Sequence, residues 1–382
     1  MCLVRYGLVI LLFSISFVQA IAQTFGCANQ LEGPCARQEI SLRMNDLQAV
    51  GSHNSYKLAI PDTELAMISD YSENSARSLD YSHLSLSTQL DMGLRQIELD
   101  IFYDPEGGRF ADPLLPRQAS ETYGELPYDD SAMHHPGFKV LHSQDIDVRS
   151  TCPSWISCLV EIKRWSDSHP QHVPILIMFN AKDDGSAYPG VKPALDFTAQ
   201  AYRALDDETL SVFPFDRIIK PDDVRGSYRT LREAVLAGNW PLLNTVRGKV
   251  LFALDETPEK VRIYMDGQPS LKGLPMFVNS IDENEAHAAY FTMNDPLRSQ
   301  DQISAAVSAG FIVRTRADAN TLEARINSTD RREAAFRSGA QYISTDYYVP
   351  RPEFSDYSVG LPGGVPARCN PVRLRNNCNG RP

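Results

Sequence analysis

Polar side chains stand at or just beyond the ends of four apolar, strand-like segments. They comprise two histidines, two acids and two amides: His53, Asn54, Glu98, Asp100, His142 and Asn180. Glu98 and Asp100 are two positions apart, so on a strand their side chains point to the same side. If the four segments are neighbours in one sheet, all of these groups meet at one edge of it.

These residue types suit chemistry on a phosphate ester. Carboxylate and amide oxygens are ligands for a hard cation such as Ca²⁺ or Mg²⁺ rather than for zinc. Such a cation neutralises phosphate oxygens and lowers the pKa of an attacking hydroxyl. One histidine can hold the phosphate or remove a proton, and another can protonate the leaving oxygen. The combination predicts cleavage of a phosphodiester.

The elements that must position these groups alternate between strand-like and helical patterns. We expect eight strands: Leu47–Ser52, Arg95–Phe102, Phe138–His142, Val173–Phe179, Lys249–Asp255, Met276–Ser280, Phe311–Thr315 and Gln341–Asp346. Helical patterns lie between several of them, at Leu84–Met92, Leu159–Ser168, Thr230–Ala237, Asp301–Ala309 and Thr329–Ser338. The alternation predicts an α/β single domain, a distorted (β/α)8 TIM barrel with long loop insertions. A doubly wound sheet is the alternative, but no G-x-G-x-x-G loop follows any strand.

Two insertions and a tail complete the predicted organisation. Tyr103–Gly137 lacks periodicity and predicts a long surface loop, whereas Asp183–Asn244 carries a helix near Pro193–Leu205. Both follow the carboxyl ends of strands, where barrel active sites are built. We expect a signal peptide over residues 1–22, a barrel domain over 23–349 and a surface tail over 350–382.

The start of the chain has the layout of a secretory signal. Arg5 precedes the apolar run Leu8–Val18, and small residues follow at Ala20 and Ala22. No apolar stretch reaches the roughly 20 residues of a membrane-spanning helix. Cleavage near Ala22 predicts a secreted, extracellular or periplasmic protein.

The cysteines fit an oxidising compartment. Of the seven, Cys2 falls in the signal segment, and the others form three close pairs. The simplest hypothesis is three local disulfides, Cys27–Cys35, Cys152–Cys158 and Cys369–Cys378. A zinc site is less favoured, because no pair has C-x-x-C spacing.

The overall charge excludes one class of partner. The chain has 48 acidic and 37 basic residues, a net charge of -11. Such a balance argues against nucleic-acid binding, which selects basic faces. It also opposes docking on an anionic lipid surface by charge alone.

Three motifs stand at the predicted strand ends: Val50-Gly51-Ser52-His53-Asn54-Ser55-Tyr56, Gly93-Leu94-Arg95-Gln96-Ile97-Glu98-Leu99-Asp100 and Val140-Leu141-His142. Together they resemble phosphatidylinositol-specific phospholipase C, and most closely its secreted calcium-dependent bacterial branch. Further similar stretches are Pro221–Gly226, Arg247–Asp255 and Ser338–Tyr347. The resemblance runs from about Leu47 to Tyr348.

The resemblance implies a single Ca²⁺ at the mouth of the barrel. Asn54, Glu98 and Asp100 match its ligands. Asn180 is a departure, because eukaryotic relatives have a glutamate at the corresponding strand end. If Asn180 is the fourth ligand, the site has two carboxylates rather than three, and its calcium affinity should be lower.

The resemblance also implies the reaction. The inositol 2-hydroxyl attacks phosphorus, which releases diacylglycerol and leaves a cyclic inositol phosphate. His53 would stabilise the transferring phosphate or help to deprotonate the hydroxyl, and His142 would protonate the leaving group. The implied partners are a phospholipid or inositol phosphodiester substrate and a transient membrane surface, with the protein a monomer.

Other residues are candidates for binding substrate, each with a structural alternative. Lys182 could contact phosphate or be a solvated charge. Arg314 and Arg316 could grip phosphate or inositol, or pair with a barrel acid. Tyr348 could stack on the inositol ring or pack in the core, and Asp346 could orient a histidine or be structural.

Two other functions remain as alternatives. A glycerophosphodiester phosphodiesterase shares the barrel, the histidine chemistry and an E-x-D pair, but usually has Arg-Gly after the first histidine, where this chain has Asn54-Ser55. A non-catalytic secreted binding protein on the same barrel is disfavoured by the intact histidines and acids.

Overall fold

A barrel of parallel strands lies at the centre of the computed structural model, which describes residues 42–124 and 128–374. Within these residues eight parallel strands run in the order β6-β5-β4-β2-β1-β9-β8-β7. They are β1 (Leu47–Ser52), β2 (Gln96–Phe102), β4 (Ile175–Ala181), β5 (Val250–Leu254), β6 (Phe277–Val278), β7 (Tyr290–Thr292), β8 (Ile312–Arg316) and β9 (Tyr342–Thr345). A parallel bridge from Asn279 to Tyr290 joins the two ends of this order. The barrel is therefore nearly closed, which confirms the predicted distorted TIM barrel.

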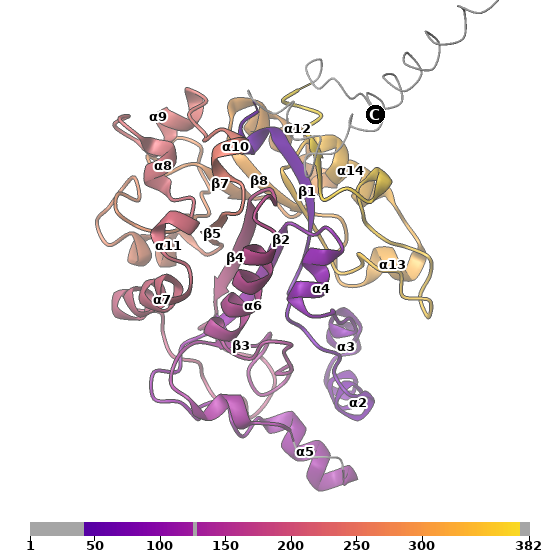
Figure 1. Ribbon diagram of the computed structural model, residues 1–382. Coiled ribbons are helices and arrows are strands. Elements are labelled where there is room, and N and C mark those ends of the chain that lie inside the picture. Colours follow the sequence, from indigo (N-terminus) through magenta and orange to yellow (C-terminus); the bar gives the residue numbers. More distant parts are fainter. Residues whose placement is uncertain (1–41, 125–127, 375–382) are drawn as a thin grey trace, which may run out of the picture.

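Helices surround the strands (Figure 1). The longer ones are α2 (Asp62–Tyr71), α5 (Leu114–Tyr123), α6 (Trp155–Ser168), α7 (Ala199–Val212), α11 (Pro258–Met265), α12 (Pro296–Ala309) and α14 (Asp330–Ser338). Shorter ones are α3 (Glu73–Leu79), α4 (Leu86–Asp91), α8 (Pro221–Arg225), α9 (Leu231–Leu236), α10 (Leu243–Val246), α13 (Leu322–Ile326) and the 3-10 turns Met44–Asp46, Ser131–His134, Phe215–Arg217 and Pro362–Gly364. Because helices cover the outside and side chains fill the inside, β2 is buried along its whole length.

One predicted barrel strand is wrong. Phe138–His142 contains only β3 (Lys139–Val140), which pairs antiparallel with the end of β2. Its apolar residues are buried because they cover that strand end, not because they belong to the barrel. The eighth barrel strand is instead β7, whose three residues are too few to show a strand pattern in the sequence.

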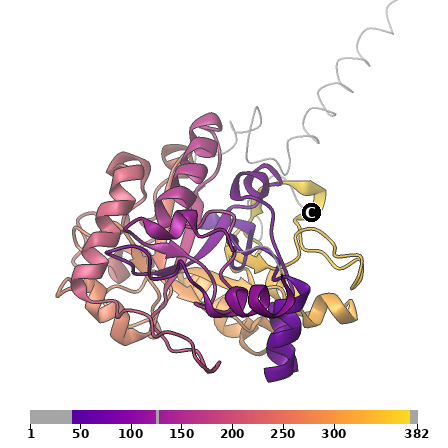
Figure 2. The same cartoon turned by 90° about the horizontal axis from the view of Figure 1, so that it is seen from below.

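The insertions contain more structure than their composition indicates. Tyr103–Gly137 includes α5, whose Leu115 and Ala119 are buried, so the prediction of a surface loop was wrong there. The helix expected near Pro193–Leu205 is α7, which begins later, where the Thr198 side chain accepts a hydrogen bond from the Ala201 N–H. The segments that follow β1 and β2 project from one end of the barrel (Figure 1), and from below they cross its mouth (Figure 2).

The tail returns to the start of the barrel. Its strand β10 (Ala367–Cys369) pairs antiparallel with β1. Cys152 and Cys158 form the predicted disulfide, and Cys369 is also disulfide-bonded. Cys27, Cys35, Cys378 and the signal segment lie outside the described residues. Within 42–124 and 128–374, no helix has the length and apolarity needed to cross a membrane.

Candidate active site

The parallel strands bring the predicted polar groups to one end of the barrel. His53 directly follows β1, Glu98 and Asp100 lie on β2, and Asn180 lies near the end of β4. In the sheet register Asp100 is directly opposite Asn180. Side chains opposite each other in a sheet share a face, so these groups point into the same mouth.

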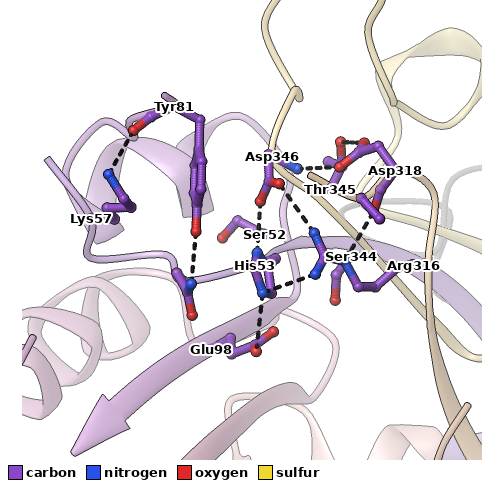
Figure 3. Close-up of polar contacts among 12 residues, drawn as sticks. Ser52, His53, Lys57, Tyr81, Glu98, Arg316, Asp318, Ser344, Thr345 and Asp346 are labelled. Atoms are coloured by element: carbon purple, nitrogen blue, oxygen red, sulfur yellow. Dashed lines mark hydrogen bonds and ion pairs between the residues drawn. The ribbon is translucent and has the colours of Figure 1, made fainter. Parts of the chain in front are cut away.

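His53 is held between an acid and an arginine (Figure 3). Its Nδ1 lies 2.8 Å from Asp346 Oδ1, and Arg316 Nη1 donates to its Nε2 at 3.1 Å. Since a guanidinium can only donate, Nε2 must be the unprotonated nitrogen, and Nδ1–H donates to Asp346. Burial, reinforced by the charge of Arg316, lowers the pKa of His53 to about 3. The imidazole is therefore neutral, with its basic nitrogen 3.9 Å from Glu98 Oε1.

Asp346 is fixed in turn by a second acid (Figure 3). Its backbone N–H donates to Asp318 Oδ1 at 2.9 Å, and the hydroxyl of Thr345 donates to Asp318 Oδ2. Arg316 Nη2 donates to Asp346 Oδ2 at 3.1 Å. Although burial opposes ionisation, His53 and Arg316 lower the pKa of Asp346 to about 2. Asp346, expected either to orient a histidine or to be structural, has the position of a residue that orients His53.

The two acids of β2 are buried and only partly neutralised. Arg314 donates to Glu98 Oε2, and the Tyr56 hydroxyl donates to Asp100 Oδ2 at 3.1 Å. Lys182 Nζ is 3.9 Å from the same Asp100 oxygen. Burial raises the pKa of Glu98 to about 7, against the opposing charge of Arg314. Added positive charge at this place would favour the ionised acids.

The four predicted ligands fit a hard cation. The amide nitrogen of Asn54 donates to the Tyr81 hydroxyl at 2.7 Å, and that of Asn180 donates to the Asp255 carbonyl. Among the described residues, one oxygen of each ligand accepts no hydrogen bond: Asn54 Oδ1, Glu98 Oε1, Asp100 Oδ1 and Asn180 Oδ1. Two acids and two amides make an oxygen donor set for Ca²⁺. Among the described residues, no three acid, histidine or cysteine side chains gather into a metal cluster.

The second predicted histidine has its own aspartate. His142 Nδ1 lies 2.9 Å from Asp147 Oδ2, and Lys57 Nζ lies 3.3 Å from the same oxygen. Lys57 Nζ also lies 4.8 Å from the centre of the Tyr81 ring, and that ring is 6.0 Å from the ring of His53. Lys57 and Tyr81 therefore connect the two histidine–aspartate pairs.

Comparison with known families agrees with this site. The family model for "Phosphoinositide phospholipase C, Ca2+-dependent" matches residues 42–371. The chain belongs to this family. No curated protein matches the sequence.

Solved structures of calcium-dependent phospholipases C share the fold. The calcium-dependent phosphoinositol-specific phospholipase C from a Gram-negative Pseudomonas sp. is 18% identical with a TM-score of 0.52, and the match covers 87% of this chain and 96% of that one. The Ca²⁺-dependent phosphatidylinositol-specific phospholipase C from Streptomyces antibioticus is also 18% identical, with a TM-score of 0.50 and coverage of 82% and 97%.

The remaining predicted site residues of this phosphoinositide phospholipase C family member divide into two groups. Arg314 and Arg316 lie in the site, where both are paired with acids, and Lys182 lies at its edge beside Asp100. Tyr348 lies near Asp346 but contacts other residues: its hydroxyl accepts from the Leu84 N–H at 2.9 Å, and its ring stacks on His83 at 5.4 Å. It lines a pocket of about 340 Å³ beside Asp346.

Several residues of the site carry no recognisable sequence signal. They are Tyr56, Lys57, Tyr81, Asp147, Asp255 and Asp318. Asp147 follows His142 by five positions in a turn, a spacing that matches neither the helix nor the strand repeat. Asp255 is the exception, because it is the last residue of the predicted strand Lys249–Asp255, whose end faces the same mouth.

Proposed function

We propose that this chain is a secreted Ca²⁺-dependent phospholipase C that cleaves phosphatidylinositol into diacylglycerol and a cyclic inositol phosphate. The observation that carries the proposal is the state of His53. Its Nε2 is unprotonated and lies beside the oxygen donors suited to calcium. A neutral histidine held by an aspartate is suited to act as a general base.

The first step is attack by the inositol 2-hydroxyl. As the hydroxyl oxygen forms a bond to phosphorus, its proton moves to His53 Nε2. Asp346 then stabilises the imidazolium through the Nδ1–H hydrogen bond. Arg316, which donates to Nε2 in this structure, is placed to donate to a phosphate oxygen instead.

The second part of the step is departure of diacylglycerol. The bond from phosphorus to the glycerol oxygen breaks, and protonated His142 supplies the proton that this oxygen needs. Although burial opposes ionisation of Asp147, Lys57 and His142 hold its pKa below its usual value, so it stays a carboxylate that holds His142 through Nδ1. Calcium bound by Asn54, Glu98, Asp100 and Asn180 supplies positive charge to the phosphate and lowers the pKa of the attacking hydroxyl.

Two further observations support the proposal. The Pseudomonas enzyme of the same fold was solved as a complex with myoinositol. The amino-terminal sequence has the layout of an export signal, which fits a calcium-rich extracellular environment.

One assay separates the proposal from its alternatives. The protein is incubated with phosphatidylinositol and with glycerophosphoinositol, each with Ca²⁺ or with a chelator, and products are followed by phosphorus NMR. We expect a cyclic inositol phosphate from the lipid only with Ca²⁺. Glycerol phosphate without a cyclic product would indicate a glycerophosphodiester phosphodiesterase, and no turnover would indicate a binding protein.

A further inference from the structure

The register of the sheet places another acid beside the calcium ligands. Asp100 of β2 lies opposite Asn180 of β4, and Phe179 of β4 lies opposite Leu254 of β5. Asp255 directly follows β5, so it lies beside Asn180, whose amide donates to its carbonyl. Because opposite residues share a face of the sheet, Asp100, Asn180 and Asp255 form a row across three neighbouring strands.

The contacts of Asp255 agree with this placement. Its backbone N–H donates to the Phe179 carbonyl at 2.9 Å, and its own carbonyl accepts from the Asn180 amide. Burial raises the pKa of its carboxyl group. The charge of Asp100 raises it further, whereas the charge of Arg314 lowers it. Its charge also raises the pKa of Glu98. The three carboxyl groups are thus close enough to interact.

The neighbouring ligands indicate where a cation would lie. Asn54 and Asp100 are 2% and 3% exposed. Each nevertheless keeps an oxygen that accepts no hydrogen bond among the described residues. These two oxygens are therefore available to coordinate a cation at the mouth of the barrel.

We propose that Asp255 is an additional calcium ligand, and that it supplies the third carboxylate that Asn180 does not provide. This inference rests on the proposed calcium-dependent function. Because the three acids form no metal cluster among the described residues, calcium binding by Asp255 would require its side chain to turn from Thr292 toward Asp100.

Calcium affinity measured by isothermal titration calorimetry on the full chain tests this role. Because the number of charged ligands sets calcium affinity, Asp255→Asn should weaken binding about tenfold or more. Glu256→Gln is the matched control: it removes the same charge one residue later, where Glu256 Oε2 lies 3.2 Å from Lys260 Nζ. It should bind calcium within about twofold of the wild type.

A second variant separates a lost ligand from a lost fold. The melting temperature without calcium establishes folding, and Asp255→Ser replaces Asp255→Asn if the amide disturbs it. If the wild type binds calcium and Asp255→Asn binds it equally well, Asp255 is not a calcium ligand, while the proposed calcium site itself stands. No calcium binding by the folded wild type would overturn the calcium site of the proposed function together with it.

Discussion

At the scale of single residues, both histidines of the site bond to an aspartate through Nδ1, and a cation pairs with each aspartate, but only Arg316 also contacts its histidine. His53 lies beside Arg316, which opposes its protonation, whereas His142 shares Asp147 with Lys57. The side chain of His53 is 17% exposed and that of His142 is 23% exposed. We therefore expect His53, flanked by Arg316, to act as the base and the more accessible His142 to protonate the departing group.

Asp346→Asn tests the orientation of His53. The new amide can donate to Nδ1, which would place the imidazole proton on Nε2 and remove the base. We expect kcat on phosphatidylinositol with saturating Ca²⁺ to fall by roughly 10²–10⁴, the contribution of general base catalysis. The far-ultraviolet circular dichroism spectrum should not change.

The control for this variant is Asp356→Asn, an exposed acid in the same carboxyl-terminal segment. It removes the same charge and should keep wild-type kcat. Wild-type kcat in Asp346→Asn would show that Asp346 does not orient the base.

The sequence allowed some of these residues to be predicted, and long-range packing hid the others. His53, Asn54, Glu98 and Asp100 were found because each lies in a local motif at a strand end. Their partners come from distant elements: Asp346 is 293 positions from His53, and Arg314 is 216 positions from Glu98. No local pattern indicates such pairs, so Asp346, Arg314 and Arg316 could be predicted only as candidates with a structural alternative.

At the scale of elements, the site depends on a close approach of β1 to β2. Gly51 of β1 pairs with Gln96 of β2. A methyl group at Gly51 would lie 2.2 Å from Gln96 Oε1 and 2.5 Å from the Gln96 carbonyl. Gln96 cannot easily move, because its side chain donates to the Ser52 carbonyl and accepts from the Ser344 hydroxyl.

Gly51→Ala should therefore destabilise the barrel by about 1–3 kcal/mol or more, as overpacking does. It should also lower activity, since Gly51 lies two residues before His53. Urea unfolding measures the stability. Gly360→Ala, where the added methyl meets no atom within 4 Å, should leave it unchanged. Equal stability of the two variants would contradict the tight contact.

Helix packing supplies a pH-dependent contribution to stability. Asp206 of α7 accepts from the Tyr264 hydroxyl of α11 at 3.2 Å and lies 3.1 Å from Arg203 Nη1. Burial raises the pKa of Asp206 to about 7, against the charge of Arg203. The folded protein thus holds this proton more tightly than the unfolded chain. The stabilisation that this bound proton provides is complete below about pH 4, the pKa of an aspartate in the unfolded chain. It is lost as the pH rises through 7.

Asp206→Asn should remove this pH dependence. Relative to the wild type, its free energy of unfolding should rise by about 2–3 kcal/mol between pH 5 and pH 8. Denaturant unfolding at both pH values measures the difference. The exposed neighbour provides the control: Asp207→Asn should follow the wild type. If the free energies of unfolding of Asp206→Asn and the wild type differ by the same amount at pH 5 and at pH 8, burial does not raise the pKa of Asp206.

The predicted elements succeeded where burial imposes a long pattern and failed where it does not. The strand predicted at Val173–Phe179 is β4, which is apolar because it is covered on both faces. β7 has three residues and no pattern of its own. Phe138–His142 is equally apolar but covers a strand end, and composition cannot separate these two kinds of burial.

At the scale of the whole molecule, a net charge of -11 opposes contact with an anionic membrane. The sequence left three sources of local attraction: calcium, a basic rim or exposed apolar residues. Arg314 and Arg316 do not form a rim, because both are paired with acids inside the site. Exposed apolar side chains, in contrast, border the pocket beside Asp346, where Leu84 is 47% exposed and Val349 is 43% exposed.

We therefore expect Leu84 to contact the lipid surface. Leu84→Ser should weaken binding to vesicles that contain phosphatidylinositol by about three- to tenfold, the cost of losing part of a buried leucine side chain. Leu236→Ser is a matched control, because Leu236 is 44% exposed at the end of α9, near the opposite end of the barrel (Figure 1). Vesicle sedimentation with Ca²⁺ measures both. Equal binding by the two variants would exclude Leu84 as a lipid contact and leave calcium as the source of attraction.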